Sequence, residues 1–199
     1  MRPLLHALVA TVCLFLGAGA QAAGDVETGK LRAQTCMGCH GAPGMRNAYP
    51  GYRVPKLGGQ HPSYIISALK AYQEKTRSHP TMQAQAADLT QEDMENIAAY
   101  FASLSDSSSR AAKEDNPATQ CAACHGPDGV SSPDDPQGAP ILAGQYPDYI
   151  VQALHEYKTG ERQNPIMSGF AAGLDKQQME TIAHFYAEQE GLAAPDIAD

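Results

Sequence analysis

The sequence predicts an all-α protein made of two tandem domains, and three observations support this prediction. A Cys-x-x-Cys-His pentapeptide at 36–40 recurs at 121–125, an offset of 85 residues. The residues that follow keep this offset without a gap, so that 36–104 and 121–189 share 26 identities. Apolar residues in both halves recur at helical spacing, and no convincing strand pattern is present. A repeat of this length indicates one duplicated domain, because solenoid repeats are shorter.

The first 22 residues have the features of a secretory signal peptide. Arg2 precedes an apolar stretch over 4–20, and Ala20-Gln21-Ala22 fits a small-residue cleavage site. An uncleaved membrane anchor is the alternative, although the stretch is marginal for spanning a bilayer. We therefore expect a signal peptide at 1–22 and export to the periplasm, with peripheral membrane association as an open alternative.

The two domains are predicted at 23–107 and 108–199, joined near the Ser-rich residues 105–109. This stretch lacks apolar periodicity, as linkers do. Each domain is small enough that an apolar core alone would give marginal stability. We therefore expect a covalent or metal-based staple in each half.

The charge balance argues against nucleic-acid binding. The chain has 14 Lys and Arg against 22 Asp and Glu, a formal net charge of −8, whereas nucleic-acid binders usually present a basic face. Loss of Arg2 with the leader would make the mature chain more acidic still. The hydrophobic content of 43% and the charged content of 18% are ordinary for a globular protein.

Three helical segments are predicted in the first half. The first covers 26–35, with Asp25 as its N-cap. Pro62 opens the second segment. The third follows Thr90, which can form a capping box with Asp93. The apolar faces of the second and third segments are Ile65, Leu69 and Tyr72, and Met94, Ile97, Phe101 and Leu104.

The second half repeats the last two of these helices, with Pro147 opening one and Asp175 capping the other. Its approach to the cysteine motif differs, because Asn116 and Pro117 would cap barely one helical turn there. Residues 191–199 are expected to form a loose tail. The apolar faces in this half are Ile150, Leu154 and Tyr157, and Met179, Ile182 and Tyr186.

Cys-x-x-Cys-His is the attachment pattern of c-type haem. The two thiols can form thioethers with the haem vinyl groups, and the adjacent histidine is then directed at the iron. Two such motifs at equivalent places in a duplicated, exported chain predict two covalently bound haem c groups. The attachment residues are Cys36, Cys39, Cys121 and Cys124, and the proximal iron ligands are His40 and His125.

Three other uses of the cysteines are less consistent with the pattern. A shared zinc site is disfavoured because each cysteine pair lies within its own repeat, far from the other. A thioredoxin-like redox pair would need a βαβ context, which the sequence lacks. Simple disulfides do not explain the histidine that follows each pair.

A second axial ligand is expected to recur at the same offset. No other histidine of the mature chain does so, which argues against bis-histidine ligation. Met94 and Met179 recur, but they lie on an apolar helix face and are assigned to the core. Met82 and Met167 also recur, each after a proline that disfavours a continuing helix. We therefore expect extended loops that bring the sulfurs of Met82 and Met167 to the iron.

With these features the chain resembles the dihaem cytochrome c4 family, which consists of tandem class I cytochrome c domains. The resemblance rests on both haem motifs, the P-x-L-x-G-Q segments at 55–60 and 140–145, the segments around Met82 and Met167, and the last helix of each half. It implies two all-α domains related by pseudo-twofold symmetry, each with a His/Met-ligated haem. It further implies a periplasmic electron carrier that passes electrons to a terminal oxidase.

Class I cytochromes commonly use a proline carbonyl to accept the ring N–H of the proximal histidine. The resemblance places this role on Pro55 and Pro140, each 15 residues after its histidine. Such a bond would fix the tautomer of the ligand. The alternative is that these prolines only shape a loop.

Closed His/Met coordination predicts outer-sphere electron transfer and no catalysis, because the iron has no open site for a substrate. Arg77 and Arg162 recur, and they are candidates for pairing with haem propionates or for bridging the domains. A solvated surface position is the default alternative for both. The acidic mature chain suggests transient, salt-sensitive docking on basic patches of its redox donor and acceptor.

Two other functions are open at this point. The chain could be the dihaem subunit of an exported dehydrogenase, for example one that oxidises a sulfur compound, with catalysis on another chain. It could instead be an enzyme, such as a dihaem peroxidase or a thiosulfate-oxidising cytochrome. That would require one haem with an open or different sixth ligand.

Overall fold

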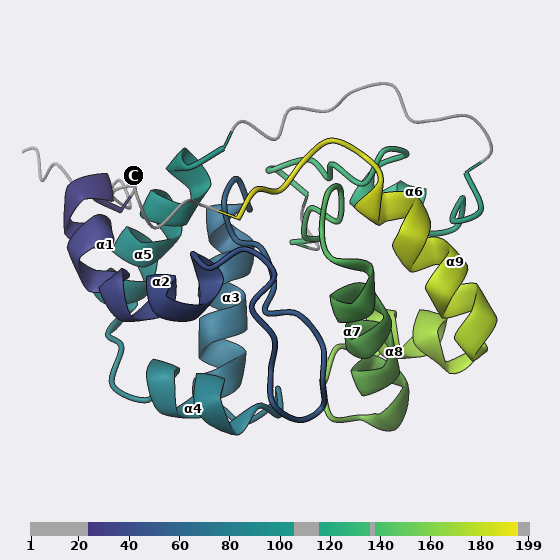
Figure 1. Ribbon diagram of the computed structural model, residues 1–199, viewed down its shortest axis with the longest axis horizontal. Coiled ribbons are helices and arrows are strands. Elements are labelled where there is room, and N and C mark those ends of the chain that lie inside the picture. Colours follow the sequence, from purple (N-terminus) through teal and green to yellow (C-terminus); the bar gives the residue numbers. More distant parts are fainter. Residues whose placement is uncertain (1–23, 106–115, 136–137, 195–199) are drawn as a thin grey trace, which may run out of the picture.

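The computed structural model describes residues 24–105, 116–135 and 138–194, which form two helical halves lying side by side (Figure 1). Helices α1 to α5 belong to the first half and α6 to α9 to the second. Within these ranges, pairing of extended backbone is limited to three isolated bridges, so the fold is all-α as predicted. The predicted leader at 1–22 and residues 106–109 of the predicted join lie outside the described residues. No helix in the described ranges has the length and hydropathy needed to cross a membrane.

The first half contains the predicted helices and one that was not predicted. Asp25 caps the first helix by accepting the amide N–H of Thr28, and Thr90 forms the capping box with Asp93. The segment predicted at 26–35 is divided between two helices. The bounds are α1 Val26–Arg32, α2 Gln34–His40, α3 Pro62–Gln73, α4 Pro80–Ala86 and α5 Gln91–Ser103.

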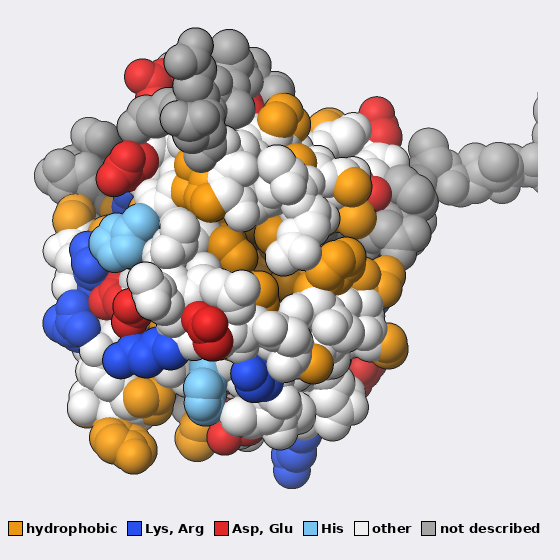
Figure 2. Space-filling model, turned by 90° about the vertical axis from the view of Figure 1, so that its right-hand side faces the viewer, with side chains coloured by type: hydrophobic (Ala, Val, Ile, Leu, Met, Phe, Trp, Pro, Cys, Tyr) orange, Lys and Arg blue, Asp and Glu red, His pale blue; other side chains and the backbone are white. Residues whose placement is uncertain are grey.

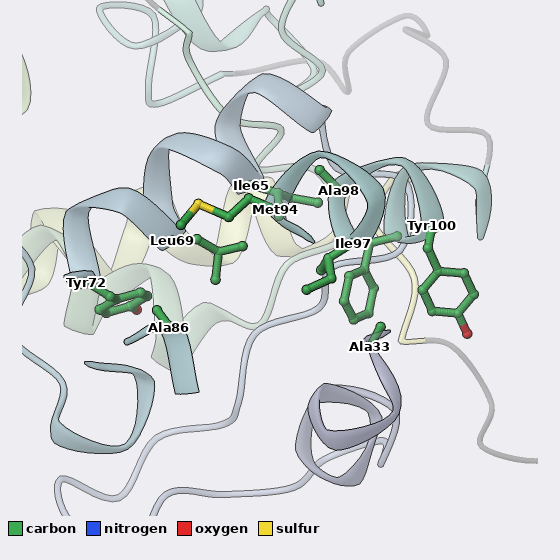
Figure 3. Close-up of a cluster of buried hydrophobic side chains, with 10 residues drawn as sticks. Ala33, Ile65, Leu69, Tyr72, Ala86, Met94, Ile97, Ala98 and Tyr100 are labelled. Atoms are coloured by element: carbon green, nitrogen blue, oxygen red, sulfur yellow. The ribbon is translucent and has the colours of Figure 1, made fainter. Parts of the chain in front are cut away.

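The core of the first half lies where α3 and α1 pack against α5 (Figure 3). α5 contributes the apolar face that the sequence predicted, and Ile97 and Phe101 are almost fully buried. α1 approaches α5 closely at Gly29, where a Cβ atom would lie 2.0 Å from the carbonyl oxygen of Asn96. The two backbones can therefore meet only because residue 29 has no side chain.

The second half has a comparable core, but the described residues hold no equivalent of α1. Its helices are α6 Ala122–His125, α7 Pro147–Thr159, α8 Pro165–Ala172 and α9 Lys176–Ala187. Turns at 117–120 precede the cysteine motif. The side-chain oxygen of Asn116 accepts the amide N–H of Ala118 at 2.6 Å. The predicted cap therefore organises a turn, as expected for so short an approach.

The prediction that Met82 and Met167 lie on extended loops was wrong. Both residues lie in the first turn of a helix, Met82 in α4 and Met167 in α8. Pro80 and Pro165 occupy the first helical position. Proline is favourable there because an N–H at this position would have no intrahelical partner, and because the fixed φ of proline suits a helix. The prolines therefore start these helices and do not prevent them.

The prediction of a loose tail after residue 190 was wrong for 191–194. Leu192 is buried in a small cluster with Ile141, and its N–H donates to the carbonyl oxygen of Ala143 at 2.8 Å. Ala193 then pairs with Gly58 of the first half through two backbone hydrogen bonds of 3.0 and 3.1 Å. Burial of one leucine and pairing across the halves hold this segment in place. Residues 195–199 lie outside the described part.

Reciprocal hydrogen bonds that follow the repeat join the two halves. The side-chain amide of Gln60 donates to the carbonyl oxygen of Ile141 at 3.0 Å and accepts the N–H of Ile141 at 2.9 Å. Gln145 makes the same pair of bonds with Lys56, both at 3.0 Å. Lys56 and Ile141 occupy equivalent positions of the repeat. The contacts therefore obey the pseudo-twofold symmetry that the resemblance implied.

Replacement of Gly29 by alanine should destabilise the protein by about 3 kcal/mol, because the new methyl group overlaps the α5 backbone, which has little room to move. Urea unfolding of the haem-loaded protein measures the effect. Gly173→Ala is the matched control, since its Cβ meets nothing within 4 Å and its φ is −82°. Equal stability of the two variants would contradict the close approach of α1 and α5.

Candidate functional site

The side chains of the first Cys-x-x-Cys-His motif line one cavity of about 160 Å³. Cys36, Cys39 and His40 reach it from α2, and Met82 reaches it from α4. Both cysteines are free thiols in the structure, so the simple disulfide considered above is not formed. Two thiols, an imidazole and a thioether therefore face the same space.

The second motif surrounds an equivalent cavity of about 310 Å³, with an adjoining one of about 90 Å³. Cys121 and His125 line both, and Met167 reaches both from α8. Cys124 lines the larger one, and both cysteines are free thiols. The two halves thus present the same four donor groups around comparable spaces.

Each histidine of the motifs is buried and oriented by a proline. His40 Nδ1 lies 2.8 Å from the carbonyl oxygen of Pro55, and His125 Nδ1 lies 2.9 Å from that of Pro140. A carbonyl can only accept, so Nδ1 must carry the proton and Nε2 must carry the free lone pair. Burial lowers the pKa of both imidazoles, which favours the neutral form that binds metals.

The methionine helices are capped by the residues before their prolines. The amide N–H of Met82 donates to Nδ1 of His79 at 3.2 Å, and that of Met167 donates to the side-chain oxygen of Asn164 at 3.0 Å. His79 and Asn164 are equivalent in the repeat but differ in type. Comparison for identity alone missed them. A search for N-cap residues directly before proline would have found Asn164 but not His79, because histidine is not a preferred N-cap residue.

Met94 and Met179 belong to the core, as predicted from their helical phase. Met94 is 2% exposed and Met179 is 4% exposed. Each lies in the apolar cluster of its own half. Neither lines the cavities of the two motifs. Helical periodicity therefore identified the two core methionines, and the ligand role of Met82 and Met167 stays a prediction.

Arg77 and Arg162 are buried between the halves and bridge them. Nη2 of Arg77 donates to the hydroxyl of Tyr149 at 2.7 Å, and Nη2 of Arg162 donates to the hydroxyl of Tyr64. Each tyrosine belongs to the opposite half. The default expectation of a solvated surface arginine was thus wrong, because the fold places these side chains where the halves meet. Neither guanidinium forms an ion pair with a carboxylate of the described residues.

Aromatic rings cover the other side of these guanidinium groups. The Arg77 guanidinium carbon lies 4.6 Å from the centre of the Tyr72 ring, and that of Arg162 lies 4.6 Å from the centre of the Tyr157 ring. Burial acts to raise the pKa of the Tyr64 hydroxyl, but the charges of Arg162 and Arg77 together lower it to about 8. The interface is therefore strongly electropositive for a buried region.

The second site differs from the first in two ways. Tyr186 replaces Phe101 at the equivalent position, and its hydroxyl is the buried side-chain polar atom that lacks a partner within the described residues. Hydrophobic side chains also gather on the outer face of the second half (Figure 2). Ile166 and Phe170 of α8 are 46% and 44% exposed and line the larger cavity, whereas α4 has Thr81 and Gln85 there.

The family model for cytochrome c matches this chain twice, over residues 26–105 and 112–189. A cytochrome c4 from Pseudomonas aeruginosa is 31% identical over 203 residues, covering 93% of this chain and 98% of the relative. The chain belongs to the dihaem cytochrome c4 family. It therefore carries two covalently bound haem c groups, and it is an electron-transfer protein and not an enzyme.

The solved structures lead to the same family. The chain matches a reduced cytochrome c4 from Pseudomonas stutzeri with a TM-score of 0.67 and 28% identity, covering 84% of this chain and 100% of that one. It also matches a thiosulfate dehydrogenase from Marichromatium purpuratum with a TM-score of 0.66, covering 83% of this chain and 40% of that one. Among the sequence relatives, a thiosulfate dehydrogenase electron acceptor from Stutzerimonas stutzeri is 32% identical, covering 78% of this chain and 79% of the relative.

The residues around each cavity fit a covalently bound haem. The site supplies two free thiols for thioether bonds, an imidazole whose Nε2 is free, and a soft thioether, and these four groups face one space. The described residues contain no cluster of three or more His, Cys, Asp or Glu side chains that could hold a metal ion. Two thiols beside an imidazole and a thioether are the donor groups that suit a covalently attached, porphyrin-bound iron.

Replacement of Tyr186 by phenylalanine should raise the free energy of unfolding by about 1 kcal/mol, because it removes a buried hydroxyl that has no partner. Denaturant unfolding of the haem-loaded protein measures this change. The control is Tyr49→Phe, since Tyr49 is 94% exposed. A loss of stability in Tyr186→Phe would indicate that the hydroxyl is hydrogen-bonded in the complete protein.

Proposed function

We propose that the chain is a periplasmic electron carrier with one six-coordinate haem in each half. The supporting observation is that the repeated cysteines, histidine and methionine of each half line one cavity. The haem iron supplies one-electron chemistry by cycling between its ferric and ferrous states. The proposed residues are Cys36, Cys39, Cys121 and Cys124 for covalent attachment, and His40 with Met82 and His125 with Met167 as axial ligands.

The two axial side chains have different tasks in this proposal. The histidines are held in one tautomer by Pro55 and Pro140, which keeps Nε2 available as a ligand. The methionine thioether is a soft ligand that favours the ferrous state and raises the reduction potential relative to a second histidine. With both axial positions filled by the protein, a substrate has no coordination site.

Arg77 and Arg162 are proposed to receive the haem propionates. Both guanidinium groups line cavities of the motifs, and both are buried without a carboxylate partner from the described residues. A buried charge is costly unless it is paired. Anionic groups held inside the cavities would provide that pairing, and they would direct the propionate edges of both haems toward the interface between the halves.

Export and domain organisation complete the proposal. The leader at 1–22 directs the chain to the periplasm, and two domains at 23–107 and 108–199 form the mature protein. The Cys-x-x-Cys-His motifs lie inside the parts that the cytochrome c model matches. Peripheral attachment to the membrane surface is compatible with this arrangement.

The direction of electron flow is proposed from the relatives. Delivery to a terminal oxidase is the first candidate, as implied for cytochrome c4. The second candidate is acceptance of electrons from an exported thiosulfate dehydrogenase, which the relatives named as electron acceptors of that enzyme support. The exposed apolar rim of Ile166 and Phe170 beside the second cavity suits the small, transient contact of such partners.

Replacement of either proposed methionine ligand should remove about half of the optical band that reports Met–iron bonding. We expect this result for Met82→Ala and for Met167→Ala in the purified ferric protein, because each contributes one sulfur to one iron. Met94→Leu is the control, since it changes a core methionine of similar volume. Loss of the band in Met94→Leu, or its persistence in Met82→Ala, would refute the ligand assignment.

Stopped-flow absorbance distinguishes the two candidate partners. If the chain serves a dehydrogenase, the ferric protein should be reduced by thiosulfate in the presence of a thiosulfate dehydrogenase, at a rate that rises with dehydrogenase concentration. If it serves an oxidase, the ferrous protein should be reoxidised rapidly by membranes that contain a terminal oxidase. In both cases the rate should fall with added salt, because charged surfaces guide the encounter.

A further inference from the structure

Each haem cavity is lined by residues of both halves. The cavity around Cys36 and His40 in the first half includes Tyr149 of the second half. The cavities around His125 in the second half include Tyr64 of the first half. The protein surrounding each haem is therefore not confined to one domain of the repeat.

Arg77 has a special position in this arrangement. It lines the cavity of the first half and the larger cavity of the second half. Its equivalent, Arg162, lines only the two cavities of the second half. Although the sequence repeat is symmetric here, the surroundings of the two guanidinium groups are not. One buried positive charge of the first half thus faces both haem sites.

Contacts from both halves hold the Arg77 guanidinium in place. The Tyr72 ring of its own half lies 4.6 Å away, and the Tyr149 hydroxyl of the opposite half accepts its hydrogen bond at 2.7 Å. The backbone beside it is also paired across the interface. Ser78 N–H donates to the carbonyl oxygen of Glu161 at 2.8 Å. The position of this charge is therefore decided by the docking of the halves.

We propose that Arg77 raises the reduction potential of the haem in the second half as well as that of its own half, and that Tyr149 is the residue that positions it. This inference rests on the haem positions proposed above. A buried positive charge favours the ferrous state, which has one positive charge less, and the interaction is poorly screened away from water. Arg162 lines cavities of the second half only, so we expect its effect on the first haem to be the smaller one.

The experiment measures the potential of one haem at a time in the full-length, haem-loaded protein. In a Met82→His background, the remaining Met–iron band reports the second haem only. Adding Arg77→Gln should lower the reduced-to-oxidised ratio of that haem about tenfold at a fixed potential, equivalent to about 59 mV for a one-electron couple. Arg77→Lys, which keeps the charge, should restore most of the ratio. In a Met167→His background, Arg162→Gln should shift the first haem less than Arg77→Gln shifts the second, because Arg162 does not line the first cavity.

Two further variants complete the design. Tyr149→Phe removes only the hydroxyl that anchors Arg77, so it should lower the ratio for the second haem about threefold even if Arg77→Gln fails to fold. Arg32→Gln is the charge control, because Arg32 is an exposed guanidinium of the same half, paired with Asp93. It should leave the potential unchanged.

The outcomes separate this inference from the ligand assignment. An unchanged second-haem potential in both Arg77→Gln and Tyr149→Phe overturns the inference and leaves the ligands untouched. Equal shifts in Arg32→Gln and Arg77→Gln overturn it too, since the effect would then be one of net charge. A Met82→His protein that keeps its full Met–iron band overturns the ligand assignment, and the inference falls with it.

Discussion

The reciprocal hydrogen bonds of Gln60 and Gln145 are the interaction on which the rest of the structure depends. Each glutamine satisfies an amide and a carbonyl of the opposite half, and the two groups of Ile141 would otherwise be buried without these partners. These bonds fix the P-x-L-x-G-Q segments, whose prolines orient the two ligand histidines. The docking of the halves and the geometry of both sites therefore have one common origin.

The same interface holds two buried positive charges between the halves. Two arginines are buried between aromatic rings and tyrosine hydroxyls, with no carboxylate of the described residues in ion-pair contact. Buried charge is costly unless it is paired, and haem propionates are suitable partners for both arginines. The duplication thus does not only double the site. It also creates an electrostatic environment that the two sites share.

The two halves differ in the segment that precedes the cysteine motif, at the position of Tyr186, and on α8. α1 packs on α5 through Gly29 in the first half, whereas turns precede the motif in the second. Tyr186 replaces Phe101, and an apolar pair on α8 replaces polar residues on α4. The first difference lies in the first half and the other two lie beside the second site, so the two redox centres have different surroundings within one repeated fold.

The sequence by itself determined the all-α fold, the repeat, the capped helices and the core position of Met94 and Met179, because these features depend on spacing and helical phase along the chain. The prediction of extended loops at Met82 and Met167 was wrong because proline can either end or begin a helix. The capping residue before each proline decides between the two. The sequence also could not place Arg77 or Arg162, which are held by tyrosines about 70 to 100 positions away in the opposite half. Nor could it place Leu192, which packs on residues of its own half about 50 to 60 positions away. Only the tertiary structure decided which residues complete each site, because hydrogen bonds between the halves leave no periodic pattern in the sequence.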